Sequence, residues 1–223
     1  MRGRCDHEWM SNPFWPFFDL RVRTPRLELR YPDDDDLASI AALAAQGIHD
    51  PDTMPFYVPW TRAESPALER GVVQFLWSRR GELSPDRWTL PFLVSEGSQP
   101  VGVQELSAQQ FPVTRAVESG SWLVRSAHGR GIGREMRAAV LHFAFEGLGA
   151  VEAYSASFED NPASEAVSRA NGYEANGSTL IAREGEPARS KKWVLTRERW
   201  FDRRRDDIEL LGLDACRELL GVR

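Results

Sequence analysis

The chain has 223 residues, 42% of them hydrophobic, which is enough to bury a sizeable core in one domain. Its net charge of −5 excludes a protein that binds nucleic acid chiefly through a basic surface. Cys5 and Cys216 lie near opposite ends, a spacing that indicates neither a disulfide framework nor a metal site. The apolar stretch at 12–20 is short and broken by Pro13 and Pro16, so we expect a cytoplasmic protein without a signal peptide or membrane helix.

The first predicted elements are a strand and a helix. Residues 18–29 alternate apolar and charged side chains, which is the period of a half-buried strand. The acidic run at 33–36 then precedes apolar residues at helical spacing, and Gly47 is a natural end for that helix. Because carboxylates are stabilised at the positive end of a helix dipole, this run predicts a helix start rather than a metal site.

A loop and a second helix follow. Residues 49–66 are rich in proline and aromatic side chains and lack periodicity, which predicts an ordered loop. Residues 65–80 predict a helix, and four apolar side chains share its buried face: Leu68, Val72, Phe75 and Leu76. The aromatic side chains of the loop therefore need a surface to pack on, between two helices.

Three predicted strands come next. Strands at 87–95 and 100–108 are joined by a turn, and a third lies at 117–124. Gly120 within the third strand marks a bulge or a close approach of the backbone.

The sequence "HGRGIGREM" at 128–136 carries three glycines at alternate positions, between that strand and a long predicted helix at 134–149. Glycine allows positive φ and close approach of the backbone to an anion, and a helix start has unpaired amides. The stretch has neither the lysine of a Walker loop nor the G-x-G-x-x-G spacing of a dinucleotide fold, which argues against a nucleotide-binding domain. A plain turn is the alternative. On the helix, we expect Arg134 and Arg137 to point away from the buried face.

The last third of the chain alternates again between strands and helices. A strand at 150–158 precedes a short helix that Gly172 ends. Strands are predicted at 178–182 and 191–196, and residues 208–221 add a strand and a helical turn. The whole pattern is a mixed α/β domain in which strands outnumber helices.

Two motifs resemble the GNAT N-acetyltransferases. The glycine stretch is similar to the acyl-CoA-binding loop Q/R-x-x-G-x-G/A of that family, with His128, Gly131 and Gly133 at its first, fourth and sixth places. The segment "DNPASEAVSRANGY" resembles the N-x-x-S-x-x-V-x-x-x-x-G-F/Y pattern of the ribosomal-protein-acetyltransferase branch, starting at Asn161. The resemblance covers about residues 18–200 and leaves 1–17 and 201–223 as extensions.

The resemblance implies a GNAT fold: a mixed central sheet of about seven strands, splayed in the middle, with helices on both faces. It implies that backbone amides of the loop surround the pyrophosphate of CoA; these belong to Gly129, Arg130, Gly131, Ile132, Gly133 and Arg134. The strand at Trp122, Leu123 and Val124 is implied to pair with the pantetheine arm, and Asn161 to hold pantetheine or a water.

The implied activity is transfer of an acyl group from acetyl-CoA to a primary amine, by direct attack in a ternary complex. Segments such as "MPFYVPWTR" and "GREMRAAVLHFAF" resemble an actinobacterial subgroup that includes a mycobacterial GNAT succinyltransferase, so succinyl-CoA is the alternative donor. The acceptor stays open among a protein N-terminus, a lysine and a small amine. We expect no nucleic-acid, membrane or metal partner, and a monomer and a homo-oligomer both stay open. A CoA-binding sensor without turnover is the alternative function.

Catalysis needs a base for the amine and an acid for the leaving thiolate. Glu118, at the start of the third strand, is one candidate base, although it also fits a solvated strand end. Glu184 is a second candidate by resemblance, and a water relay without either is a third. Ser164 is implied as proton donor, or is simply a hydroxyl at a helix start.

The aromatic loop is the candidate acceptor site. Phe56, Tyr57 and Trp60 lie between the first two predicted helices, where the family lines its acceptor cleft. These side chains either shape the acyl and acceptor pocket or cap the core, and the two roles are compatible.

Overall fold

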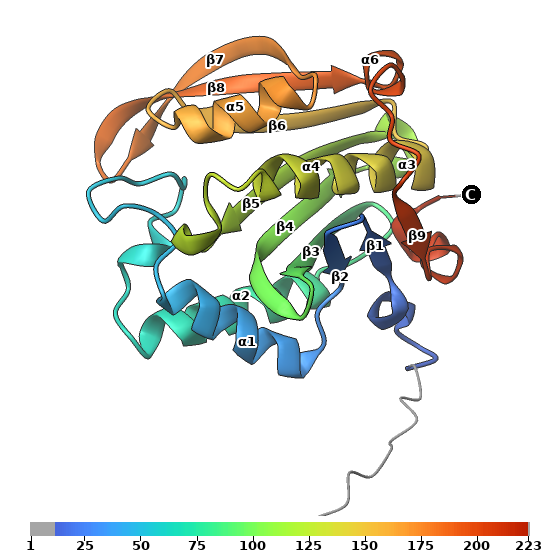
Figure 1. Ribbon diagram of the computed structural model, residues 1–223, viewed down its shortest axis with the longest axis horizontal. Helices are drawn as coiled ribbons and strands as arrows, with labels where there is room; N and C mark the ends of the chain where they lie inside the picture. The colour runs from blue at the N-terminus through green and yellow to red at the C-terminus, as the bar shows by residue number, and fades with distance from the viewer. Residues whose placement is uncertain (1–11, 223) are drawn as a thin grey trace, which may run out of the picture.

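A single sheet of nine strands runs through residues 12–222, the part of the chain that this computed structural model describes (Figure 1). Its order is β7-β8-β6-β5-β4-β3-β2-β1-β9, and neighbours are antiparallel except β5 and β6, which are parallel. The strands are β1 (Arg21–Arg23), β2 (Leu27–Arg30), β3 (Arg87–Glu96), β4 (Gln99–Gln109), β5 (Ala116–Leu123), β6 (Glu152–Phe158), β7 (Glu174–Arg183), β8 (Glu186–Thr196) and β9 (Glu209–Leu211). The predicted mixed sheet is confirmed, with more strands than expected.

The N-terminal region forms a hairpin where one strand was predicted. The Thr24 amide donates to the Leu27 carbonyl at 2.9 Å, and the Leu27 amide donates back to the Thr24 hydroxyl at 2.9 Å. Pro25 in this turn has no backbone N–H group to donate to a neighbouring strand. The predicted single strand is therefore divided there into β1 and β2.

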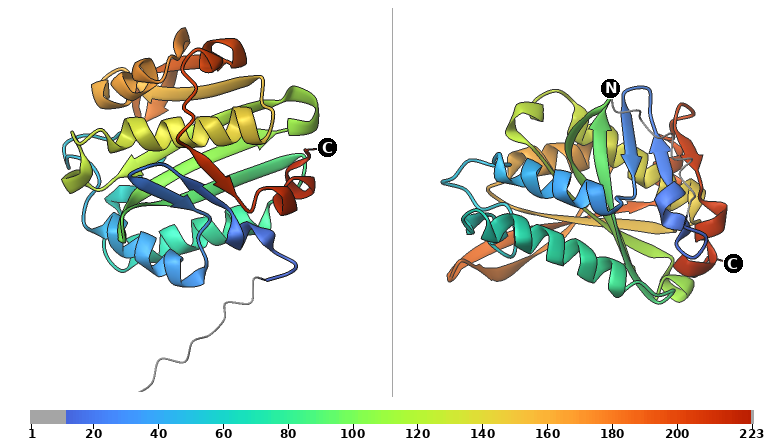
Figure 2. Two further views of the ribbon diagram at one scale, coloured as in Figure 1. Left: turned by 45° about the vertical axis from the view of Figure 1, so that its right-hand side comes forward. Right: turned by 90° about the horizontal axis from the view of Figure 1, so that it is seen from below.

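Helices cover both faces of the sheet, as predicted. Figure 2 shows α1 and α2 together on one side and α4 and α5 on the other. The helices are α1 (Asp34–Ala45), α2 (Ala67–Gly81), α3 (Phe111–Thr114), α4 (Ile132–His142), α5 (Pro162–Ala170) and α6 (Arg197–Phe201). No helix between residues 12 and 222 is both long enough and apolar enough to span a membrane.

The acidic run starts α1, as the sequence predicted. The Asp33 carboxylate accepts from the Asp36 amide at 2.9 Å, and the Asp36 carboxylate accepts from the Asp33 amide at 3.2 Å. This reciprocal pair satisfies two amides that the first helical turn leaves unpaired. Arg30 then pairs with the largely buried Asp36 at 2.5 Å, which ties the helix start to β2.

One of the four side chains predicted to be buried on α2 is exposed. Leu68, Val72 and Leu76 are buried between α2, α1 and the sheet, as expected. Phe75 is 46% exposed, because it lies beside the buried stripe and faces an open cavity.

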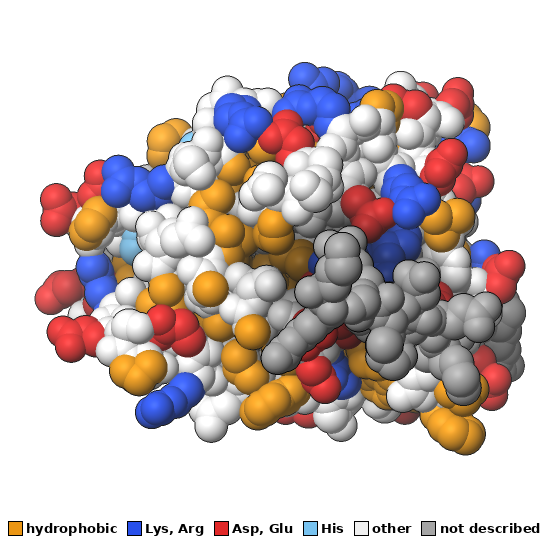
Figure 3. Space-filling model, turned by 60° about the horizontal axis from the view of Figure 1, so that its bottom comes forward, with side chains coloured by type: hydrophobic (Ala, Val, Ile, Leu, Met, Phe, Trp, Pro, Cys, Tyr) orange, Lys and Arg blue, Asp and Glu red, His pale blue; other side chains and the backbone are white. Residues whose placement is uncertain are grey.

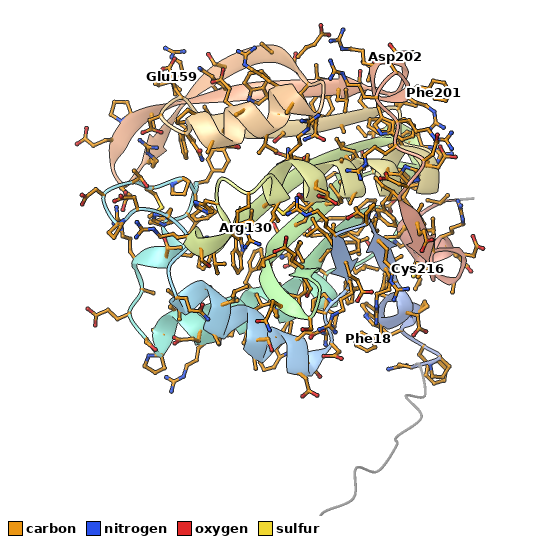
Figure 4. The ribbon with its side chains drawn as sticks, viewed as in Figure 1. Phe18, Arg130, Glu159, Phe201, Asp202 and Cys216 are labelled. Atoms are coloured by element: carbon orange, nitrogen blue, oxygen red, sulfur yellow. The ribbon has the colours of Figure 1, made fainter. Side chains whose placement is uncertain are left out.

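The C-terminal residues pack into the same body as the rest of the chain. Strand β9 pairs with β1, and Leu213, Cys216 and Leu220 are buried against the core beside it (Figure 4). Burial raises the pKa of the Cys216 thiol to about 12, which makes it unreactive. Cys5 lies outside the described residues. The segment predicted as a C-terminal extension thus contributes to the core from residue 208 onward.

Strands β5 and β6 separate in the middle of the sheet. They pair over three positions, from Ala116 opposite Glu152 to Glu118 opposite Tyr154. Beyond these positions the pairing ends, while β4 stays paired with β5 up to Leu123 and β8 stays paired with β6 up to Phe158. This is the predicted splay, and it leaves one edge of β5 free from residue 119 onward.

Candidate active site

A cavity of about 1260 Å³ opens at the splay and extends to α2 and the loop before it. Of the residues that the sequence singled out, fourteen line it: Phe56, Tyr57, Trp60, Glu118, Trp122, Leu123, His128, Gly129, Gly131, Ile132, Gly133, Arg134, Asn161 and Ser164. Val124, Arg130 and Glu184 do not. The fold therefore brings together residues from β5, α4, α5, the glycine loop and the aromatic loop.

The glycine loop presents unpaired amides to this cavity. Gly129 and Gly131 have φ of +71° and +78°, which a side chain would strain, and Gly131 caps α4. Within residues 12–222, no hydrogen bond engages the backbone amides from Gly129 to Arg134. These donors and the positive end of the α4 dipole converge on one place, which suits a phosphate group.

The loop is anchored by charged side chains outside the cavity. Arg130, labelled in Figure 4, directly precedes the α4 cap. It pairs with Glu96 at the β3–β4 turn. Arg26 pairs with the same carboxylate at 2.8 Å. At the end of β5, His128 Nε2 donates to the Leu123 carbonyl oxygen at 3.1 Å. The Arg130 side chain thus positions the loop and faces away from its amides.

Asn161 and Ser164 form the start of α5. The Asn161 side-chain oxygen accepts from the Ser164 amide at 3.1 Å, an N-cap that directs this end of the helix into the cavity. Helices α4 and α5 pack against each other at Gly133, where a Cβ would lie 3.4 Å from Val167 Cγ2, in ordinary van der Waals contact. Both helix starts therefore face the same space.

The sequence interpretation overlooked Glu105 on β4. Its carboxylate reaches the cavity floor, and burial raises its pKa to about 7, although Arg79 acts to lower it. No side chain or amide among residues 12–222 hydrogen-bonds to this carboxylate. Opposite it, Gly120 leaves room: a Cβ there would lie 3.8 Å from Glu105 Oε2. The β4–β5 ladder runs past Gly120 without the predicted bulge.

The two predicted glutamates have different surroundings. Glu118 is exposed at the last paired position of the β5–β6 ladder and faces the cavity beside Glu105. Glu184 lies in the β7–β8 turn and pairs with Arg62 at 2.9 Å, which lowers its pKa. A carboxylate held in its charged form by an arginine is a weaker base than one whose pKa lies near 7.

The side chain of Arg137 on α4 is buried, contrary to the prediction. It was predicted to point away from the buried face of its helix, but only 3% of it is exposed. Its guanidinium lies behind the splay, 3.1 Å from Ser155 Oγ on β6 and 3.3 Å from Ser121 Oγ on β5. No carboxylate among the described residues pairs with it, and its Nε atom lacks a partner. A buried, unpaired cation lining the cavity is costly unless an anion joins it.

The aromatic loop before α2 is held over the cavity by the β7–β8 hairpin. Tyr57 Oη lies 2.7 Å from Ser190 Oγ, and Arg183 donates to the Met54 carbonyl at 3.1 Å. Trp60 packs on Trp122 at a centroid distance of 6.2 Å, which joins the loop to β5. The predicted pocket role and the predicted capping role are therefore both consistent with its position.

Residues 26–174 match the family described as an acetyltransferase (GNAT) domain. The chain belongs to the GNAT acetyltransferases. The match extends over more than half of the chain and includes α1, the glycine loop and α5.

Solved GNAT structures share the fold at low identity. RimL, a ribosomal L7/L12 α-N-protein acetyltransferase in complex with coenzyme A, is 20% identical, with a TM-score of 0.63 over 78% of this chain and 95% of that one. A spermidine N-acetyltransferase SpeG chimera from Vibrio cholerae and hSSAT is 17% identical, with a TM-score of 0.64 over 79% and 99%. A GNAT acetyltransferase from Bacillus anthracis is 17% identical, with a TM-score of 0.63 over 80% and 99%.

Two cavity residues of this GNAT domain, Glu105 and Arg137, were not predicted, and the sequence around each gives only a weak indication of its role. Glu105 is the single charge inside an otherwise uncharged strand, in "PVGVQELSA", on the same face as Val103. Arg137 follows Gly133 by four residues, so the two residues lie on the same face of α4. A charged side chain can lie on that face because strands β5 and β6 separate beside it.

Proposed function

We propose that this GNAT protein transfers an acyl group from an acyl-CoA thioester to a primary amine. The observation that carries the proposal is that the glycine-loop amides and the Glu105 carboxylate open into one cavity through the splay. The loop suits the phosphates of the donor, and a carboxyl group with a pKa of about 7 suits the deprotonation of the acceptor.

The donor would lie along elements that leave their polar groups free. Amides from Gly129 to Arg134 would hold the pyrophosphate, aided by the α4 dipole. The free edge of β5, at Ser119 to Leu123, would pair with the amides of pantetheine, and Trp122 would cover it on the α2 side. Asn161 would contact the same arm from the start of α5.

In the reaction, Glu105 accepts a proton from the ammonium form of the acceptor, directly or through a water, and later releases it to solvent. The neutral amine nitrogen then bonds to the thioester carbonyl carbon and the carbon–sulfur bond breaks. The nitrogen gives up its second proton, which reaches the leaving thiolate through Ser164, the proposed donor, so that the serine ends as a hydroxyl. Glu118, one step along the same face of the sheet, remains the second candidate base. Glu184 stays a prediction, and its pairing with Arg62 fits a role in holding the loop instead.

A succinyl group is the second candidate for the acyl chain. The specific observation in its favour is the buried Arg137 without a carboxylate partner among the described residues, because a succinyl carboxylate would neutralise it. Arg137→Met should then lower turnover of succinyl-CoA far more than turnover of acetyl-CoA. An equal effect on both donors would favour acetyl transfer with Arg137 as a support for the splay.

The proposed function is tested by thiol release. The purified chain is incubated with acetyl-CoA or succinyl-CoA and a panel of primary amines, and free CoA thiol and acylated amine are measured together. Amine-dependent thiol release with matching product supports the proposal. CoA binding without turnover on any amine would instead indicate a CoA-binding sensor.

A further inference from the structure

The acceptor side of the cavity differs chemically from the donor side. Its walls come from α2, from the aromatic loop and from the α2 face of the sheet. The residues of α2 that line this wall are all apolar or glycine: Ala67, Leu68, Gly71, Val72, Phe75 and Leu76. Among them, Ala67, Gly71 and Phe75 are spaced four residues apart on one stripe of the helix. Phe56 and Trp60 form the wall opposite, with their ring centroids 5.3 Å apart. Figure 3 shows hydrophobic side chains gathered across the middle of the face on the α1–α2 side.

Negative charge at this end is confined to the floor. Among residues 12–222, the carboxylates that line the cavity are Glu105, Glu118 and Asp160. Asp160 is already paired with Arg183, at 2.9 and 2.6 Å. Glu105 and Glu118 are diagonal neighbours across β4 and β5, so both lie at the same end of the space between α2 and the aromatic loop, which we call the slot. An ammonium group therefore has a partner at the floor, and the α2 wall offers none to a second one.

The α2 wall is also unsuited to a peptide. Main-chain amides and carbonyls inside a helix are paired with each other, so Ala67, Gly71 and Phe75 present side-chain surface alone. A peptide backbone laid along this wall would lose hydrogen bonds to water and gain none in return.

Gly71 opens the slot. A glycine inside a helix is less stable than an alanine by roughly 0.5–1 kcal/mol, because its backbone loses more freedom on folding. Nothing in the packing demands a glycine here, since a Cβ at Gly71 would meet no atom within 4 Å. The empty space beside it belongs to the cavity. A longer side chain at this position would project into the slot between α2 and the aromatic loop.

We infer that the acceptor is a small primary amine carrying a bulky apolar group, and that Gly71 determines this specificity by leaving room for that group. The inference rests on the proposed acyltransferase function and names the substrate class for the same site. The amine lies at Glu105, and its apolar substituent fills the space between Gly71, Phe75 and the pair formed by Phe56 and Trp60.

The test compares four acceptors with acetyl-CoA as donor: methylamine, 2-phenylethylamine, spermidine and a tripeptide with a free N-terminus. Rates are expressed per concentration of neutral amine. We expect kcat/KM for 2-phenylethylamine to exceed that for methylamine by about 10- to 100-fold, the usual effect of burying one aromatic side chain. Preference for spermidine or the tripeptide would overturn the inference, as would equal kcat/KM for all four, which would leave the proposed function standing. No turnover with any amine would contradict both the inference about the acceptor and the proposed acyltransferase function.

The variant Gly71→Leu tests the role of the glycine. It should lower the ratio of kcat/KM for 2-phenylethylamine over methylamine by at least about 10-fold. Gly81→Leu is the matched control: it lies in the same helix, a Cβ there also meets nothing within 4 Å, and it is outside the cavity. Gly71→Ala, which stabilises the helix, should lower the ratio in the same direction. An unchanged ratio in both variants at position 71 would overturn the assignment.

Discussion

The donor half and the acceptor half of the cavity are built in different ways. The donor half uses main-chain amides of one short stretch, Gly129 to Arg134, at the start of one helix. The acceptor half uses side chains from β4, α2 and the aromatic loop, which are far apart in the sequence. In the first, the backbone conformation carries the function; in the second, the position of each side chain does.

This difference explains which substitutions each half tolerates. A loop that binds through its amides is expected to be sensitive to backbone strain and little affected by the identity of exposed side chains. A site that depends on Glu105 is sensitive to the loss of one carboxylate. Substitutions in the two halves should therefore separate donor binding from proton transfer.

The largest expected effect is that of Glu105→Gln. Loss of the base should lower kcat/KM by about 10²- to 10⁴-fold without changing CoA affinity. The kcat/KM of the unaltered protein should rise as pH increases through about 7, because the carboxylate must lose its proton to act, and this limb should be absent in the variant. Glu118→Gln, at the neighbouring position, is the control. If it removes the limb and Glu105→Gln does not, the base is Glu118.

The next largest effect concerns the glycine loop. Gly131→Leu places a side chain at φ +78° and disturbs the amides around it, so CoA affinity should fall by at least about 10-fold in a calorimetric titration. Gly149→Leu is the control for strain alone, since Gly149 has φ +71°, meets no atom within 4 Å and is outside the cavity. Equal loss of CoA affinity in both variants would contradict a direct role for the loop.

A smaller effect is expected on stability. The pKa of Glu105 is raised from 4.5 to about 7, so the folded state holds a proton that the unfolded state releases between these pH values. Stability should accordingly fall as pH rises from about 4.5 to 7. Glu105→Gln removes this cost and should raise the free energy of unfolding above pH 7 by about 1–3 kcal/mol. Urea unfolding at pH 5 and pH 8 measures the difference, and a loss of stability at pH 8 would contradict it.

The smallest effect is expected for Glu184→Gln. Its ion pair with Arg62 is solvent-exposed, so the free energy of unfolding should change by less than about 1 kcal/mol. Turnover should stay within a few-fold of the unaltered protein, because the carboxylate is outside the cavity. A loss of turnover comparable to that of Glu105→Gln would restore Glu184 as the base.

Much of the fold could be predicted from the sequence, where the signals are local. The Asp33 cap, the helix after Gly131 and the strands from β3 to β6 follow from turn chemistry and periodicity within a few residues. The hairpin of β1 and β2 was missed, although the buried apolar positions change from even (Leu20, Val22) to odd (Leu27, Leu29) across the turn at Thr24 and Pro25. A strand was predicted within residues 208–221, where β9 lies, but its pairing with β1, nearly 190 residues away along the chain, could not be predicted from local pattern.

The sequence by itself determined the loop that we propose as the donor site, since alternate glycines before a helix leave amides free wherever the helix packs. Tertiary structure alone decided the rest. Two side-chain environments, the partly buried Glu105 and the buried Arg137 facing one cavity, depend on the separation of β5 from β6, which is a property of strands paired across the sheet. Burial raises the pKa of Glu105 and leaves the Arg137 guanidinium without a carboxylate partner among the described residues. The burial of a side chain depends on residues far away in the sequence, so the neighbouring residues do not predict it.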